Sequence, residues 1–205
     1  MLTGDLADPA TPDVLIAATL ARFGRLDALV ANAGYADRTP TADVSDAALE
    51  RAHQTLLASF HRLVRAALPA LRDADRPAIL AVSAFGAHVI RPGLPLFPAT
   101  AAAKAGLEVL IRSLAVELAA DGIAVNAVIP GFIRKDAGTQ AALDKATAAR
   151  QAEAIPLGRL GTPDEVAAAI AFFLSPQANG ITGARLAVDG GLIAATRLFP
   201  QPPAA

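Results

Sequence analysis

One lysine, Lys104, lies within the apolar, alanine-rich stretch LFPATAAAKAG, which runs from Leu96 to Gly106. Leucine and isoleucine recur after it at helical spacing, and Lys104 extends their row toward the amino end of the helix. Phe97 and Thr100 precede it at positions that fall on the same side of a helix. We therefore expect the lysine to point inward, with a pKa lowered because burial disfavours the charged form.

Ser83 is expected to lie near this lysine, because it stands at the end of an apolar run where strand ends of a parallel sheet meet. Ser83, Thr100 and Lys104 then share one crevice. Each has a simpler alternative. The stem of Lys104 covers apolar surface while its ammonium reaches water, and Ser83 caps the turn after its strand. The three histidines have no spacing typical of a metal site, so none is predicted.

Short apolar runs alternate with longer helical segments along the chain. The runs that predict strands are Leu26–Gly34, Pro77–Ala84, Gly122–Gly131 and Ala184–Gly191. The segments that predict helices are Pro12–Phe23, Asp46–Leu71, Pro98–Ala120 and Pro163–Leu174, with Thr11 and Thr162 as N-caps. This alternation predicts an α/β fold in one domain, residues 1–205, with helices on both faces of a parallel sheet.

Two segments are predicted to be less firmly held than this framework. Ala137–Ile155 is helical in pattern but polar and alanine-rich, which suits a mobile flap over the crevice. Residues 193–205 are expected to form a flexible tail.

The composition excludes several classes of protein. Lys and Arg number 18 against 19 acidic residues, so a formal charge of -1 offers no basic surface to nucleic acid or to an anionic membrane. The absence of cysteine excludes disulfides, thiolate nucleophiles and zinc–thiolate sites. No apolar run reaches the ~18 residues that a membrane span needs. We expect a cytoplasmic protein that binds neither nucleic acid nor membrane.

Five segments, in order, resemble the short-chain dehydrogenase/reductase family from about Gly4 to Leu192. They are GDLADPA, LDALVANAGYA, AILAVSAFG, AAAKAGLEVLIRSLAVELAADGIAVNAVIPGFI and IPLGRLGTPDEVAAAIAFFLSPQANGITGARLAVDGGL. The resemblance implies a Rossmann-like doubly wound parallel sheet. It also implies hydride transfer between NAD or NADP and a small-molecule alcohol or ketone.

The resemblance further implies a set of cofactor-binding residues. Its members are Asp5, Asn32, Ala33, Gly34, Lys104, Pro130, Gly131 and Ile133. The first matches the family's acid beside the adenine, the next three match the turn on the adenosine side of the cleft, and the last three match the loop that meets the nicotinamide carboxamide. The lysine matches the one that holds the nicotinamide ribose and lowers the pKa of a neighbouring phenol. Ser83 and Thr100 join it as the implied catalytic positions.

The active-site positions depart from the family pattern. Carbonyl reduction in the family uses a tyrosine four residues before the lysine, and that position is Thr100 here. Phe97 stands where the enoyl-reductase branch keeps its tyrosine, and Thr55 stands where the family has a helix asparagine. An aliphatic hydroxyl has a pKa far above that of a phenol, so it is a poor general acid near neutrality. The resemblance therefore implies a degenerate active site.

A second departure concerns the glycine-rich TGxxxGxG turn that binds the pyrophosphate in the family. No such turn precedes GDLADPA, so the first βαβ portion of the fold is expected to be missing. The absent first strand would lie next to Leu26–Gly34, which is then expected to expose an apolar edge. A partner, a rearranged segment or an incomplete gene model would each explain this.

Three functions stay open at this point. The first is an NAD(P)-dependent oxidoreductase, impaired in this shortened chain; the second is a non-catalytic subunit that pairs with an active paralogue; the third is a small-molecule binding module. A bulky apolar substrate is favoured over a phosphorylated one, because Ala137–Ala154 carries no arginine cluster. Surplus apolar residues on Asp46–Leu71 and Pro98–Ala120 predict a homodimer or homotetramer, or a hetero-oligomer with the paralogue.

Overall fold

The computed structural model describes residues 2–134 and 145–195. Within them, four parallel strands form a sheet in the order β1-β2-β3-β4. The strands are β1 (Ala28–Ala31), β2 (Ala78–Val82), β3 (Ala124–Pro130) and β4 (Arg185–Val188). Each lies inside one of the predicted runs. Because all four run the same way, their carboxyl ends meet at one edge of the sheet.

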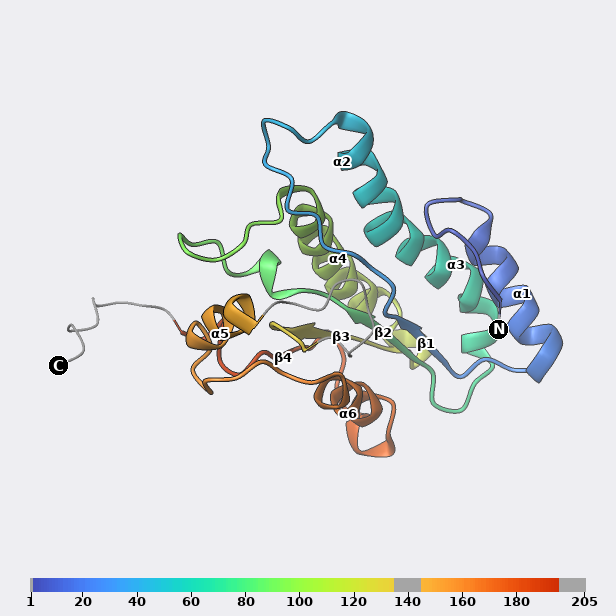
Figure 1. Ribbon diagram of the computed structural model, residues 1–205. Coiled ribbons are helices and arrows are strands. Elements are labelled where there is room, and N and C mark those ends of the chain that lie inside the picture. The colour runs from blue at the N-terminus through green and yellow to red at the C-terminus, as the bar shows by residue number, and fades with distance from the viewer. Residues whose placement is uncertain (1, 135–144, 196–205) are drawn as a thin grey trace.

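Helices cover both faces of this sheet, as the sequence predicts (Figure 1). They are α1 (Thr11–Phe23), α2 (Asp46–His53), α3 (Ser59–Arg72), α4 (Pro98–Glu117), α5 (Lys145–Glu153) and α6 (Pro163–Phe173). Helices α1, α3 and α4 lie on one face and α6 lies on the other. The prediction of an α/β, Rossmann-like parallel sheet is confirmed. None of the described helices is long and apolar enough to cross a membrane.

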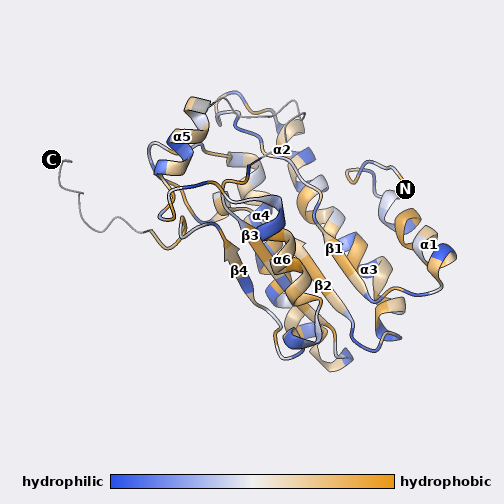
Figure 2. Ribbon diagram, turned by 60° about the horizontal axis from the view of Figure 1, so that its bottom comes forward, coloured by the Kyte–Doolittle hydropathy of each residue, from blue (hydrophilic) through white to orange (hydrophobic). Residues whose placement is uncertain are grey.

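Alternating side chains of the strands supply two cores. Ile79 and Ala81 of β2 pack into the cluster under α1, α3 and α4, whereas Leu80, between them, packs with Val128 and Phe173 under α6. Successive side chains of a strand point to opposite faces, so a strand buried on both sides must be apolar throughout. Figure 2 shows this as hydrophobic colour along β1, β2 and β3.

The ends of the helices follow the predicted caps in one case of two. Thr162 accepts a hydrogen bond from the backbone N–H of Glu165, whose side chain accepts one from the Thr162 backbone, so this capping box fixes the start of α6. The expectation that Thr11 is an N-cap was wrong. Thr11 is the first residue of α1, its N-cap position is Ala10, and no side chain caps it.

The long predicted helix Asp46–Leu71 is interrupted by a π-helical turn, Gln54–Ala58, between α2 and α3. One extra residue in such a turn displaces the following helix, and π turns are frequent at functional sites. The hydroxyl of Thr55, in this turn, is buried and makes no hydrogen bond. The turn therefore presents an unpaired polar atom inside the protein, at the position where the family has its asparagine.

The outer edge of β1 has no neighbouring strand among the described residues. Beside it lies a cavity of about 410 Å³, lined mainly by apolar side chains of α1, β1 and α3 and, at one end, by Thr55 and Lys104. The expectation that this strand has an apolar edge therefore agrees with the described part of the chain.

The predicted flap and tail fall partly outside the described residues. Of Ala137–Ile155, the part from residue 145 is described, and it forms α5. Of the tail, residues 193–195 are described and are hydrogen-bonded, Ile193 to the Asp189 carboxylate and Ala195 to the Gly191 carbonyl.

The expected surplus of apolar side chains on Asp46–Leu71 is smaller than the sequence suggests. Leu56, Phe60 and Val64 are each no more than 3% exposed, because they pack beneath the helices of this same chain. On α4, by contrast, Val109 is 53% exposed and Val116 is 81% exposed. The outer face of α4 is therefore the part of these two predicted helices that offers the most exposed valine side chains for a shared surface.

We predict that the double variant Val109→Glu/Val116→Glu shifts a dimer toward monomer in light scattering at micromolar concentration. Two carboxylates on each copy would have to be desolvated in an interface built on this face. Val14→Glu, at a similarly exposed position of α1, is the control and should leave the mass unchanged. A wild-type chain that is already monomeric would contradict the prediction.

Candidate functional site

Lys104 extends inward from α4 to the carboxyl end of β2. Its ammonium donates a hydrogen bond to the backbone carbonyl of Val82 at 2.5 Å, and the residue is 7% exposed. The carbonyl is the last of β2, so the sheet edge and the helix face together position the cation. The expectation of an inward-pointing lysine agrees with this geometry.

Burial lowers the pKa of Lys104 to about 8, while the Glu108 carboxylate, one helical turn later, acts in the opposite direction. The desolvation effect is the larger of the two. A lysine with such a pKa is charged at neutral pH yet exchanges its proton readily near that range.

Ser83 lies one residue beyond Val82, but its hydroxyl turns to a different partner. Its Oγ donates to Oε1 of Glu108 at 2.5 Å, and its backbone N–H continues the pairing with β3 by bonding the carbonyl of Val128. Ser83 is therefore held to the lysine's helix, with its proton already engaged. The simpler reading of Ser83 as a cap for the turn is not what its side chain does.

Glu108 is the centre of a polar cluster that the sequence reasoning missed. Its carboxylate is almost fully buried and accepts hydrogen bonds from Ser83, from His88 Nε2 at 2.8 Å and from Arg185 at 3.2 Å. The partners come from the end of β2, the loop after it and the start of β4. The only sequence signal was an acidic residue in the apolar row that follows Lys104.

Thr100 lies on the lysine's side of α4 and is buried. Its hydroxyl accepts a hydrogen bond from the backbone N–H of Asp37 at 3.4 Å. Where the family has a phenol, this chain thus has a small side chain that helps to hold the loop after β1 against α4.

Asn32, Ala33 and Gly34 form the first residues of that loop and are exposed. A Cβ placed on Gly34 would lie 3.5 Å from the ammonium of Lys104 and 3.3 Å from Leu56. The glycine therefore leaves a side of the buried cation open to the crevice.

Pro130, Gly131 and Ile133 follow β3 at the same edge of the sheet. Gly131 is required for packing, because a Cβ there would lie 2.8 Å from Cα of Asp189. Ile133 forms a parallel bridge with Gly161, in which the hydrogen bonds are made by the flanking Phe132 and Arg134. The backbone N–H and C=O of Ile133 itself are left without a partner among the described residues.

Asp5 lies on the surface before α1. Its carboxylate accepts hydrogen bonds from the backbone of Ala7 and from Arg51, and these bonds lower its pKa. Asp5 is thereby fixed to α2 rather than to any member of the Lys104 cluster.

Phe97 does not join the lysine. Its ring lies edge-on to Phe85, at a centroid distance of 5.9 Å, and Phe85 also packs against Phe132. Arg38 lies over the other side of the ring. The position at which the enoyl-reductase branch keeps a tyrosine is thus part of an aromatic cluster in this chain.

The comparisons with known proteins identify the family of the chain. Residues 1–193 match a family model described as enoyl-(acyl carrier protein) reductase. The chain belongs to the short-chain dehydrogenase/reductase family. Among curated relatives, it is 41% identical to cis-4-hydroxycyclohexanecarboxylate dehydrogenase of Sinomonas cyclohexanicum, over 93% of this chain and 75% of that protein. It is 37% identical to an L-rhamnose 1-dehydrogenase (NAD(P)(+)) of Azotobacter vinelandii, over 92% and 73%.

A solved dehydrogenase structure has the same fold. The ligand-free aldohexose dehydrogenase of Thermoplasma acidophilum superposes with a TM-score of 0.86 at 27% identity, covering 98% of this chain and 80% of that one. Since these relatives are named dehydrogenases, the chain is placed among the oxidoreductases.

We predict that stability depends on pH through Lys104. The folded-state pKa of about 8 lies below the ordinary lysine pKa of 10.5, so the unfolded chain binds the proton more tightly. Relative to Lys104→Met, the wild type should therefore gain stability as pH rises from about 8 to about 10.5, by on the order of 3 kcal/mol. Urea unfolding at pH 7.5, 9 and 10.5 measures this. Parallel pH profiles for the two proteins would show that the lysine is not desolvated.

Proposed function

We propose that this chain is an NAD(P)-dependent oxidoreductase that interconverts a secondary alcohol and a ketone. The observation that carries the proposal is the buried ammonium of Lys104 at the carboxyl ends of β1 and β2. An open sheet edge of this kind is where parallel α/β folds bind nucleotides. The dehydrogenases and reductases among its relatives support the same class of reaction.

Two features of the crevice fit the nicotinamide half of such a cofactor. Gly34 leaves the space beside the Lys104 ammonium free of a side chain. Ile133 has a backbone donor and a backbone acceptor without described partners, which is what a primary carboxamide requires. The rest of the proposed set, Asp5, Asn32, Ala33, Pro130 and Gly131, lies on segments that border the same edge or precede α1.

The cofactor would supply the hydride, and the chain's residues would supply position and charge. Lys104 would donate hydrogen bonds to the ribose hydroxyls while holding the carbonyl of Val82. Ile133 would orient the carboxamide through its backbone. The role of Ile133 would require no movement of the sheet. The pairing of β3 with β4 and the close contact of Gly131 with Asp189 already fix the segment that carries it.

Proton transfer is the weak step. The Ser83 hydroxyl donates a hydrogen bond to Glu108, and Thr100 carries an aliphatic hydroxyl that already accepts a hydrogen bond from the backbone N–H of Asp37. The Ser83 proton is engaged and an aliphatic hydroxyl such as that of Thr100 is too weak an acid, so neither group is suited to donate a proton to a developing alkoxide near neutral pH. We therefore propose that catalysis by this chain is impaired relative to members with a phenol.

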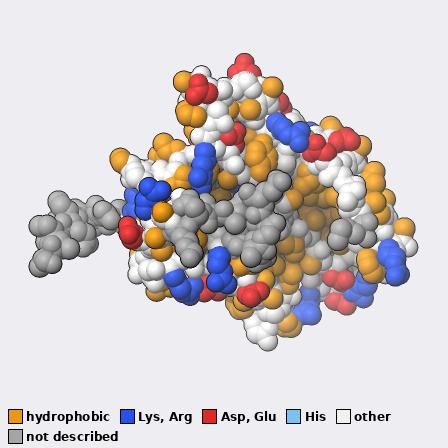
Figure 3. All heavy atoms as spheres, viewed as in Figure 1, with side chains coloured by type: hydrophobic (Ala, Val, Ile, Leu, Met, Phe, Trp, Pro, Cys, Tyr) orange, Lys and Arg blue, Asp and Glu red, His pale blue; other side chains and the backbone are white. Residues whose placement is uncertain are grey.

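The proposed substrate is a bulky apolar alcohol or ketone, and the proposed location is the cytoplasm. One relative is named for a hydroxylated cyclohexane carboxylate and another for a sugar. The choice between NAD and NADP stays open. Charges of both signs are interspersed on the face shown in Figure 3, which favours neither a nucleic acid nor a membrane as partner.

A second candidate is a non-catalytic subunit that pairs with an active paralogue. It is favoured by the threonine at position 100 together with the exposed valines on α4. A third candidate is a small-molecule binding module that would use the crevice of Ser83, Thr100 and Lys104 without redox chemistry. Because it shares the site of the first proposal, only a measurement of catalytic turnover distinguishes the two.

We expect the 205-residue chain to bind NADH or NADPH no more tightly than about millimolar, because its sequence has no TGxxxGxG turn for the pyrophosphate. Isothermal titration measures this, with Lys104→Met predicted to weaken binding further and the exposed Arg65→Met as the control. A micromolar dissociation constant for the wild type would refute this expectation.

We further expect Thr100→Tyr to raise carbonyl reduction by about 10², the scale of a positioned general acid. The assay follows NAD(P)H oxidation in a chain extended by a glycine-rich βαβ unit, so that cofactor binding is not limiting. Phe97→Tyr is the matched control and should have little effect, since Phe97 packs against Phe85. If neither variant is active once cofactor binding is confirmed, this crevice is not a redox site.

A further inference from the structure

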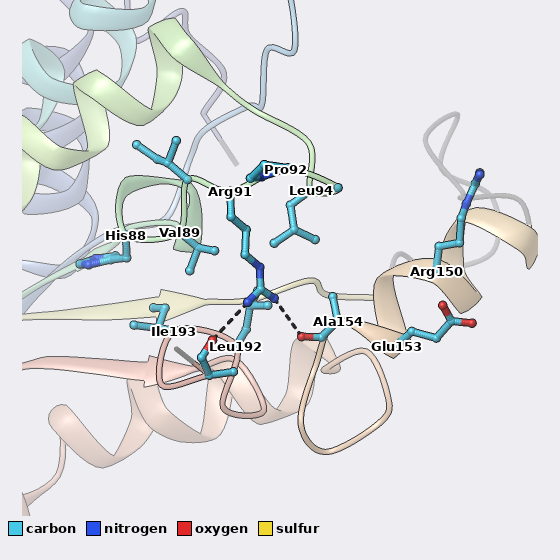
Figure 4. Close-up of a pocket in the computed structure, with 13 residues that line it drawn as sticks. His88, Val89, Arg91, Pro92, Leu94, Arg150, Glu153, Ala154, Leu192 and Ile193 are labelled. Atoms are coloured by element: carbon cyan, nitrogen blue, oxygen red, sulfur yellow. Dashed lines mark hydrogen bonds between the residues drawn. The ribbon is translucent and has the colours of Figure 1, made fainter. Parts of the chain in front are cut away.

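A second hollow of about 630 Å³ lies beside the polar cluster of Glu108, on the side away from β1. It is bounded by the loop after β2 (residues 88–94), by α5 and by the residues that follow β4, at 192–195. Figure 4 shows that three segments far apart in the sequence meet there. The loop carries the histidine that binds Glu108, so the hollow adjoins the site described above.

Arg91 stands in the middle of this hollow (Figure 4). Its guanidinium donates hydrogen bonds to the carbonyl of Ala195 at 3.1 Å and, more weakly, to that of Ala154 at 3.4 Å. Arginine has five N–H donors, so these bonds leave three N–H groups for a ligand. No carboxylate of the described residues pairs with Arg91.

Apolar side chains form part of the wall around the guanidinium. Val89, Leu94, Leu192 and Ile193 line it, and Leu192 is fully buried in the cluster formed with Phe85 and Phe132. A ligand that fills the hollow would therefore place a hydrocarbon body against these side chains, with any anionic group directed to Arg91.

Among the described residues that line the hollow, the other charged groups lie at its margin. Arg150 and Glu153 project from α5 at one end of the hollow, and the His88 ring lies at the opposite end (Figure 4). The His88 ring is engaged by Glu108. Of the described lining residues, Arg91 is the charged group that an occupant of the centre would meet, and Glu153 is an opposing charge on α5.

We propose that this hollow binds a small molecule with a carboxylate on an apolar body, and that Arg91 binds the carboxylate. That this ligand is also the substrate rests on the proposed function; the binding itself does not. The proposal revises the simple apolar substrate expected from Ala137–Ala154, because the cation comes from the loop after β2 and not from that segment.

A carboxylate suits the site better than a phosphate. One planar guanidinium with three remaining donors can bind the two oxygens of a carboxylate side by side. A phosphate ester carries more charge and is commonly held by several cations or by a helix amino end. At this hollow, Glu153 lies on the same rim as Arg150.

The experiment compares cyclohexanecarboxylate with its neutral isostere, cyclohexanecarboxamide, by NMR titration of the wild-type chain without cofactor. We expect the carboxylate to bind about tenfold or more tightly than the amide, and to shift the Nε–H resonance of Arg91. Cyclohexyl phosphate serves as the third probe. Tighter binding of the phosphate, or equal binding of acid and amide, would overturn the assignment.

Two variants test the residue. Arg91→Lys keeps a positive charge but removes the planar pair of N–H donors, and it should remove most of the preference for acid over amide. The NMR signal that disappears in this variant is the Nε–H resonance of Arg91. Glu153→Gln removes the opposing charge and should strengthen carboxylate binding a few-fold. Arg91 also donates hydrogen bonds to two backbone carbonyls, so its substitution could prevent folding. In that case the comparison of acid and amide binding by the wild type decides whether the proposal holds. If the wild type binds neither at millimolar concentration, Arg91 serves only to tie the segments together.

Hydride transfer is measured in a separate assay from carboxylate binding. A chain that binds the carboxylate but never oxidises or reduces any partner would retain this inference and lose the proposed function. A chain that reduces neutral ketones but ignores the carboxylate would do the reverse.

Discussion

A buried carboxylate, that of Glu108, is the constraint on which much of this architecture depends. An ionised carboxyl inside a protein is costly unless its oxygens are hydrogen-bonded and its charge is balanced. Here Ser83, His88 and Arg185 meet that requirement, and each comes from a different segment. To satisfy one side chain of α4, the end of β2, the following loop and the start of β4 must all be in place, so the polar cluster fixes how the helix lies on the sheet.

The position of Lys104 on the same buried face of α4 as Glu108 explains how its ammonium is accommodated inside the protein. Lys104 and Glu108 lie one turn apart on the buried face, and the carboxylate partly offsets the desolvation of the ammonium. The backbone carbonyl of Val82 supplies its hydrogen bond. In this chain the lysine therefore has a structural role that does not depend on a neighbouring phenol, and its presence alone does not establish turnover.

The loop after β2 connects this cluster to the hollow around Arg91. The His88 ring is bonded to Glu108, whereas Arg91, three residues later, donates to one carbonyl just after α5 and to one in the segment after β4. A single loop thus links the crevice at the strand ends with the space in which a small molecule would lie. This connection makes the polar cluster and the candidate ligand site parts of one region of the molecule.

The sequence by itself determined the order and type of the elements, since apolar runs and helical periodicity are local properties of the chain. It also identified Lys104 as an inward-pointing cation, because its neighbours along the helix define the buried face. It could not show which group the Ser83 hydroxyl bonds or that Gln54–Ala58 forms a π-helical turn. It also could not show that Leu56, Phe60 and Val64 are buried within this chain. The sequence also did not predict that Arg91 bonds the carbonyls of Ala154 and Ala195. Nor did it predict that His88 and Arg185 bond Glu108. Those contacts join residues far apart in sequence, and only the packing of α4 and the loops on the sheet decides which of them meet.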